Sequence, residues 1–305
     1  MPLESSALEV TLIYNPNSGG VAGVTSDELL KALYDEGFRA VHPYTECEED
    51  LDAALAQPGD LVVTVGGDGT TRAVATRLLG RDVPLAVIPA GTANNVARTL
   101  GVAGKPAELV RGLRRSRRCK YDVGKVTGPW GESYFLEALG VGLFADMLAD
   151  YHPEQGKSVL RAVGSVRDIL IDYKARHWRV ALDGQDVSGD YVALEVLNTK
   201  ATGPRLVLAP EADPTDGLLD VVFVLVPENV TLLDYATRLL QDKFEELPNV
   251  RRVLAKELKL TWQGEPLHLD AEVRGQEGAQ PAAEITVSVL PQALELLLPE
   301  AVAEK

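Results

Sequence analysis

The stretch Gly66-Gly67-Asp68-Gly69-Thr70 has residue types that could hold a phosphate group. It follows the apolar run Leu61–Val65, which predicts a strand buried on both faces, and residues at helical spacing come after it. Glycines let a backbone approach a ligand closely, and the first N–H groups of a helix have no partner inside the helix. The spacing therefore predicts a phosphate-binding turn between a strand and a helix.

The carboxylate of Asp68 inside this turn would repel a bare phosphate. It fits the turn if it holds a metal ion or a metal-bound water, or takes a proton from an attacking hydroxyl. A tight turn with Asp68 as the helix N-cap is the alternative that the turn alone leaves open.

Two further loops of turn-forming residues follow apolar strands. Asn15–Gly20 comes after Val10–Tyr14, and Pro89–Asn95 comes after Leu85–Ile88. Helical patterns alternate with these strands, which predicts an α/β domain with a parallel sheet and helices on both faces. The loops would then gather at the carboxyl edge of the sheet, where open α/β folds bind ligands.

The pattern changes near Tyr121, where short strands and turn signals begin to dominate. Asp183-Gly184 is a type I′ hairpin signal. We expect a mostly antiparallel second domain, a β-sandwich or open barrel, interrupted by two helices. The predicted domains are residues 1–124, 125–290 and a C-terminal segment 291–305 that returns to the first domain. The expected strands include 133–139, 178–182, 191–197, 206–208, 219–226, 258–262, 267–270 and 284–290, and the helices lie around 160–170 and 232–240.

Composition and charge exclude several classes of protein. The 305 residues carry a net charge of −15, which argues against a general nucleic-acid binder. No apolar run reaches transmembrane length. The two cysteines suggest no disulfide framework and the four histidines show no zinc spacing, so we expect a reducing cytoplasm.

The basic run Arg111–Lys120 is interpreted as a solvated helix face, with contact to anionic lipid headgroups as the alternative.

Several motifs, taken together and in order, resemble the diacylglycerol kinase family, which includes bacterial lipid kinases and sphingosine kinases. In the first half they are Asn15-Pro16-Asn17-Ser18-Gly19, Gly66-Gly67-Asp68-Gly69-Thr70 and Pro89-Ala90-Gly91-Thr92-Ala93-Asn94. In the second half they are Asn198, Gly203-Pro204, Leu208–Asp220 and Leu269-Asp270-Ala271-Glu272. The resemblance implies an ATP-binding α/β domain, a β-rich domain and an active site in the cleft between them.

The resemblance also implies roles for individual residues. Glu272 matches the position of the proton acceptor, with Asp270 beside it. Two residues apart on one strand, these carboxylates would face the same side and could divide the roles of base and metal holder. Asp213, Asp216 and the carbonyl of Leu218 match a metal-binding turn, suited to Mg²⁺ or Ca²⁺. The nucleotide would be lined by Asn15, Pro16, Asn17, Ser18, Gly19, Thr45, Gly66, Gly67, Asp68, Gly69, Thr70, Thr71, Arg72 and Thr92.

The chain departs from the family pattern at a few positions. Arg72 and Ala73 replace an Asn-Glu pair that often follows the first glycine motif. Ala271 stands where the family has glycine, and alanine cannot take glycine-only backbone angles cheaply. Arg72 could supply positive charge to the site.

The implied function is an ATP- and Mg²⁺-dependent lipid kinase acting on a lipid hydroxyl, with diacylglycerol converted to phosphatidic acid as the default. A sphingoid base, ceramide or phosphatidylglycerol stays open as substrate. The enzyme would be cytoplasmic, bind a membrane surface peripherally and bind no nucleic acid, with a homodimer left open. One alternative is an NAD kinase-like enzyme, which shares the first glycine turn but needs a different second one. The other is a nucleotide-binding regulator with little turnover.

Overall fold

The chain folds into two compact units. The computed structural model describes residues 8–19, 24–43, 45, 47–149, 173–226, 234, 237–239, 241–270, 272–275 and 282–300. The first unit comprises residues 1–122 and 292–305, and the second comprises residues 123–291. The chain passes from one unit to the other within strand β5 (Arg117–Gly128) and returns within strand β19 (Ala283–Leu298). The sequence alone places these boundaries at 124/125 and 290/291.

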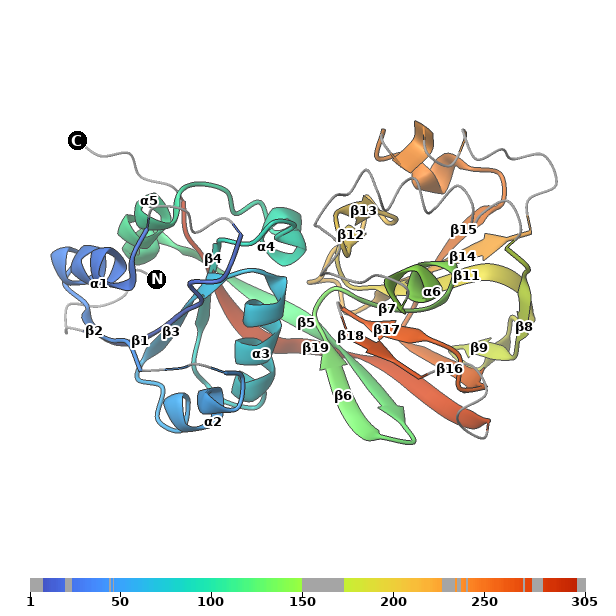
Figure 1. Cartoon of the computed structure of the whole chain (residues 1–305), viewed down its shortest axis with the longest axis horizontal. Coiled ribbons are helices and arrows are strands. Elements are labelled where there is room, and N and C mark those ends of the chain that lie inside the picture. The colour runs from blue at the N-terminus through green and yellow to red at the C-terminus, as the bar shows by residue number, and fades with distance from the viewer. Residues whose placement is uncertain are drawn as a thin grey trace. The chain divides into compact units, whose positions relative to one another are not determined.

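The first unit is a parallel sheet with helices on both faces, as predicted. Its strand order is β2-β1-β3-β4-β19, and the last pairing joins Leu296 and Leu297 of β19 to β4. Helices α1 and α5 lie together on one face, and α2 and α3 lie on the other (Figure 1). The elements are β1 (Glu9–Tyr14), α1 (Ser26–Asp35), β2 (Arg39–Val41), α2 (Asp50–Ala54), β3 (Leu61–Gly66), α3 (Asp68–Leu78), β4 (Leu85–Pro89), α4 (Asn95–Thr99), α5 (Pro106–Arg111) and a 3₁₀ turn (Leu113–Arg115).

Local sequence signals set the ends of helix α1. Thr25 accepts a hydrogen bond from the amide of Glu28, whose side chain accepts one from the Thr25 amide, which is a capping box. At the other end Gly37 has a φ of +78°, and the amides of Gly37 and Phe38 donate to the carbonyls of Tyr34 and Leu33. This is a Schellman motif, so the glycine predicted to end the helix does so.

The second unit is an antiparallel sandwich, which confirms the predicted fold class. One sheet contains β10-β9-β16-β19 with β5 and β6, and the other has the order β15-β14-β11-β7-β17-β18 with β8 beside β11. A core that includes Trp178, Phe223 and Trp262 lies between them. The elements are β6 (Gly131–Phe135), β7 (Ala138–Gly142), α6 (Leu143–Ala149), β8 (Arg176–Trp178), β9 (Val180–Leu182), β10 (Gln185–Asp186), β11 (Gly189–Leu197), β12 (Ala201–Thr202), β13 (Leu206–Val207), β14 (Leu219–Leu225), a 3₁₀ turn (Phe244–Glu246), β15 (Val250–Ala255), β16 (Glu257–Trp262), β17 (Leu267–Leu269) and β18 (Glu272–Arg274).

One turn prediction in the second unit is confirmed at atomic detail. Asp183 and Gly184 have φ values of +47° and +81°, and they join β9 to β10 as a two-residue turn. Positive φ at both central positions defines the type I′ hairpin that the Asp-Gly pair indicates. The helix expected around 160–170 lies outside the described residues, as does most of the one around 232–240.

The single strand predicted over 133–139 is wrong. Strand β6 ends at Phe135 and β7 begins at Ala138. The amides of Leu136 and Glu137 between them donate to the carboxylate of Asp270 instead of to a neighbouring strand. An apolar run cannot show this break, because its cause lies more than 130 residues further along the chain.

The helix-face interpretation of the basic run Arg111–Lys120 is also wrong. Helix α5 ends at Arg111, a 3₁₀ turn follows, and Arg117 begins strand β5. Arg114 caps helix α1 by donating to the carbonyls of Glu36 and Gly37, the latter at 2.9 Å, and it stacks over Phe38. These contacts give Arg114 a structural task, whereas Arg115 is exposed.

Among the described residues, no helix is both long and apolar enough to cross a membrane.

Candidate active site

Three loops converge at the carboxyl edge of the parallel sheet. The side chain of Asn15 donates to Oγ1 of Thr70 at 2.9 Å, which joins the loop after β1 to the start of α3. A Cβ placed on Gly91 would lie 2.5 Å from Cα of Gly67, so these two backbones touch. A Cβ on Gly19 would lie 2.9 Å from Oγ1 of Thr92. Glycine is needed at these contacts because any side chain would separate the loops.

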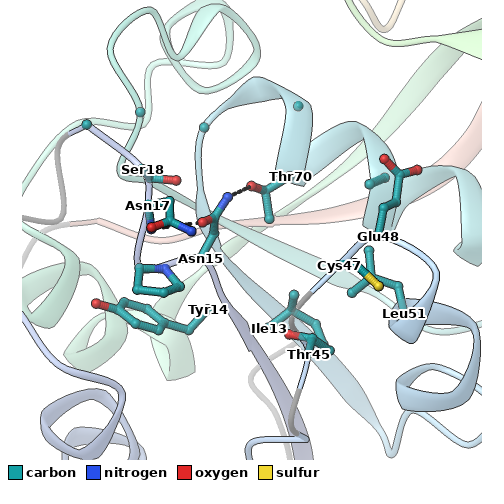
Figure 2. A pocket seen from close by; sticks show the side chains of 16 residues that line it. Ile13, Tyr14, Asn15, Asn17, Ser18, Thr45, Cys47, Glu48, Leu51 and Thr70 are labelled. Carbon is teal, nitrogen blue, oxygen red and sulfur yellow. Dashed lines mark hydrogen bonds between the residues drawn. The ribbon is translucent and has the colours of Figure 1, made fainter.

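A cavity of about 780 Å³ opens on these loops (Figure 2). This volume is within the range of small-molecule and cofactor sites. Asn15 points across it toward Thr70, and the amide of Asn17 donates to Oδ1 of Asn15 at 3.0 Å. The residues predicted to bind nucleotide that line the cavity are Asn15, Pro16, Asn17, Ser18, Gly19, Thr45, Gly67, Gly69 and Thr70.

Other predicted nucleotide residues do not line this cavity. Thr71 is buried, and its hydroxyl donates to the carbonyl of Gly67 at 3.1 Å. Gly66 lies against the side chain of Thr70, where a Cβ would come within 2.6 Å. Asp68, Arg72 and Thr92 are likewise outside the lining. Their part in nucleotide binding stays a prediction.

One wall of the cavity was not predicted from the sequence. It is made by Cys47, Glu48 and Leu51, around the start of α2 (Figure 2). Arg77 of α3 holds this wall, with its guanidinium 3.2 Å from Glu48 and 2.6 Å from Asp52. The sequence order could have indicated this wall. Helix α2 follows strand β2, so the first turn of α2 lies at the same sheet edge as the glycine loops.

Asp68 is the first residue of helix α3, and its carboxylate faces a second helix. Oδ1 accepts a hydrogen bond from the amide of Val96 at 3.2 Å, at the start of α4. Burial raises the pKa of Asp68, and hydrogen bonds from the amides of Val96, Asn95 and Asn94 oppose that rise. The carboxylate therefore links the two glycine turns through the amino-terminal end of α4.

Asp270 and Glu272 are not on one strand. Leu269 of β17 pairs with Glu272 of β18 in an antiparallel hairpin, so Asp270 lies in the turn, with a φ of +52°. Its carboxylate accepts three backbone hydrogen bonds, from Leu136 at 3.1 Å, Glu137 at 2.8 Å and Ala138 at 3.0 Å. Aspartate tolerates a left-handed backbone better than most residues, which explains how this turn forms without glycine at position 270.

The two carboxylates consequently differ in surroundings. Asp270 is 5% exposed and its oxygens face amides, whereas Glu272 is exposed at the start of β18 and lies 3.5 Å from Arg274. Three backbone N–H groups that donate to a carboxylate stabilise its charged form and so make it a poorer proton acceptor. Of the pair, only Glu272 is exposed, and its part as a base stays a prediction.

The segment held by Asp270 also holds Asn198. The carbonyl of Glu137 accepts hydrogen bonds from the amides of Asn198 and Thr199, at 2.7 and 3.3 Å. The side chain of Asn198 donates to the carbonyl of Leu136 at 3.1 Å. Two family motifs, Asn198 and the Asp270 turn, thus meet through one short segment.

Asp213 and Asp216 lie in one exposed turn before strand β14. Oδ1 of Asp213 accepts from the amide and hydroxyl of Thr215, at 3.0 and 2.7 Å, and Oδ1 of Asp216 accepts from the amide of Leu218 at 2.8 Å. The described residues contain no group of three or more His, Cys, Asp or Glu side chains suited to a metal. Two carboxylates and a carbonyl are nonetheless hard oxygen donors of the kind that Mg²⁺ and Ca²⁺ accept.

A glycine cradle on a parallel sheet is typical of nucleotide-binding enzymes. Two family models match the chain and identify the kind of enzyme. The model of the diacylglycerol kinase catalytic domain matches residues 9–126, and that of the YegS C-terminal NAD kinase beta sandwich-like domain matches residues 139–298.

Individual proteins agree with these matches. The chain is 28% identical over 306 residues to a diacylglycerol kinase of Mycobacterium tuberculosis, covering 95% of each chain. A solved diacylglycerol kinase structure from Bacillus anthracis has a TM-score of 0.67 at 20% identity and covers 98% of this chain and 100% of that one. Yeast NADH kinase, solved with NADH, shares the fold at a TM-score of 0.55 and 9% identity, covering 97% and 85%.

The chain belongs to the diacylglycerol kinase family, and it is a lipid kinase of the YegS type. The family predicted from the sequence motifs is thereby confirmed. Membership implies the use of ATP and of a divalent metal.

Proposed function

We propose that this lipid kinase transfers the γ-phosphate of ATP to the hydroxyl of diacylglycerol and so forms phosphatidic acid. The observation that carries the proposal is the convergence of three glycine-containing loops on one cavity, in a chain whose relative along 95% of its length is a diacylglycerol kinase. The first unit would bind ATP through the cavity lining. The backbone amides of Gly67 and Gly69 would approach the phosphates.

Proton transfer is assigned to the second unit. We assign the proton acceptor to Glu272, because the carboxylate of Asp270 is already occupied by three amides. Asp270 would act as a positioning residue that holds the turn before Glu272. Asp68 would organise the phosphate end of the site, as its place beside both glycine turns suggests.

Divalent metal ions would bind at two sites. Magnesium bound with ATP would neutralise charge on the transferred phosphoryl group. We assign a structural magnesium or calcium to Asp213, Asp216 and the carbonyl of Leu218, where it would fix the entry to strand β14. Peripheral binding to a membrane surface and a homodimer stay predictions.

The test is a transfer assay with γ-labelled ATP, magnesium and a panel of acceptors in mixed micelles. The panel should contain diacylglycerol, ceramide, a sphingoid base, phosphatidylglycerol and NAD. Labelled phosphatidic acid as the main product supports the proposal. Main labelling of another lipid would overturn the substrate, and labelled NADP would overturn the assignment to lipids. The likeness to yeast NADH kinase shows the fold alone and favours no second function.

A further inference from the structure

Glu195 and His268 form a fully buried ion pair in the second unit. Nε2 of His268 lies 2.7 Å from Oε2 of Glu195, and both side chains are 0% exposed. The pair spans three adjacent strands, because Glu195 in β11 is opposite Gly140 in β7, and Gly140 is opposite His268 in β17. A Cβ on Gly140 would lie 2.1 Å from the Glu195 carboxylate. Glycine at 140 therefore lets the carboxylate cross the middle strand.

Fold stability alone does not account for such a pair. Removing two charges from water costs several kcal/mol for each, and apolar residues of similar volume often serve a core equally well or better. The chain nonetheless places charge here, inside a sandwich whose other core residues are mostly aliphatic and aromatic. A specific task for the imidazole would explain the pair.

The second ring nitrogen of His268 shows what that task is. Nδ1 lies 3.3 Å from the carbonyl oxygen of Asp270. The Nδ1–H group can therefore donate to this carbonyl, while Nε2 shares a proton with the carboxyl group of Glu195. Burial lowers the pKa of His268, but the charge and hydrogen bond of Glu195, together with those of Asp270, outweigh burial, so the pKa lies above its usual value.

Asp270 is consequently held on two sides. Amides of the segment 136–138 hold the carboxylate of Asp270, and His268 faces its carbonyl. The strand that begins two residues later starts with Glu272. Any shift of the Asp270 peptide would redirect the chain that enters β18 and carries this carboxylate.

We propose that Glu195 and His268 are positioning residues for phosphoryl transfer. The imidazolium holds the Asp270 carbonyl, Glu195 holds the imidazolium, and together they set where the Glu272 carboxylate lies. Neither residue touches substrate, and both act through Glu272. The inference rests on the proposed role of Glu272 as proton acceptor.

The main test is the double variant Glu195→Leu/His268→Leu, which removes both charges and leaves none buried alone. We expect it to fold with a melting temperature near that of the parent, a kcat lowered about 10- to 100-fold, and an unchanged KM for ATP. Glu195→Gln should keep most of kcat, because a neutral histidine can still donate from Nδ1 to Asp270. A folded double variant with the parent kcat overturns the proposal.

Two controls separate positioning from general stability. Trp178→Phe removes another buried hydrogen bond of this unit, 2.6 Å from Trp178 Nε1 to Glu265, and should lower the melting temperature without lowering kcat. If the double variant fails to fold, Gly140→Ala tests the positioning role of Glu195 and His268 instead. Its Cβ displaces Glu195, so kcat should fall with KM unchanged, and an unchanged kcat overturns the proposal.

A double-mutant cycle distinguishes failure of this proposal from failure of the proposed function. In a Glu272→Gln background, the Glu195→Leu/His268→Leu change should cause no further fall in kcat, because it acts through Glu272. An additive fall overturns the positioning role alone. No ATP-dependent labelling of lipid by the parent protein would instead overturn the proposed function.

Discussion

Substitution of Asp270 should reveal how many hydrogen bonds its carboxylate makes. Oδ1 accepts from the amides of Glu137 and Ala138, and Oδ2 accepts from the amide of Leu136. Asparagine can keep the two bonds to its oxygen but turns an NH₂ group toward Leu136. It therefore leaves one buried N–H unsatisfied, at a cost of about 1–3 kcal/mol.

Alanine at position 270 should cost far more. It leaves all three amides without an acceptor, which is roughly three times the asparagine cost. The φ of +52° adds about 1–2 kcal/mol for alanine, whereas asparagine adopts this conformation readily. The expected ratio of the two losses is therefore at least about 3:1.

The assay is denaturant unfolding monitored on Trp178 and Trp262, the buried tryptophans of the second unit, together with hydrogen exchange of the three amides. Asp270→Asn should speed exchange at Leu136 by about 5- to 150-fold, which corresponds to 1–3 kcal/mol, and speed Glu137 and Ala138 less. Equal free-energy losses for the two variants would refute the reasoning. So would uniform acceleration at all three amides in Asp270→Asn.

Three further predictions concern the other parts of the molecule. Asp68→Asn should lower turnover by about 100-fold or more in a folded protein, and near-parent turnover would contradict the role assigned to its charge. Asp216→Ala should lower the melting temperature and abolish stabilisation by added magnesium, whereas an equal magnesium effect in parent and variant would place the metal elsewhere. Arg115→Glu should weaken binding to anionic vesicles without changing the melting temperature. Arg114→Ala should instead lower the melting temperature, because Arg114 caps helix α1. Unchanged vesicle binding by Arg115→Glu would show that Arg115 is only a solvated surface group.

The first unit was predictable because its signals are local. Strands β1, β3 and β4 each end in a loop that contains glycine or asparagine, and the parallel arrangement brings those loops to one edge. The backbone contact between Gly67 and Gly91 is the physical reason for glycine at both positions. The wall made by Cys47, Glu48 and Leu51 was missed because none of these residue types signals phosphate chemistry.

The second unit was predicted less completely, because its key contacts are long-range. The prediction that Asp270 and Glu272 lie on one strand was wrong, because it assumed that the side chains alternate between the two faces of a strand through residues 270–272. A turn at Asp270 separates β17 from β18 there. The amides that hold Asp270 lie more than 130 residues away. Similarly, Glu195 and His268 are 73 residues apart and carry no shared motif. A polar residue in the middle of an apolar strand, such as Glu195 within β11, was the one visible sign.

The most direct test of the central claim is the rate of labelled phosphate transfer from ATP to lipid in the variant Glu272→Gln. If Glu272 is the proton acceptor, kcat should fall about 10²- to 10⁴-fold while the KM for ATP is unchanged, because the nucleotide is held by the first unit and only proton transfer is lost. Asp270→Asn should retain far more activity than Glu272→Gln. Parent-like transfer by Glu272→Gln, or a greater loss in Asp270→Asn, would contradict the assignment of Glu272 as the proton acceptor.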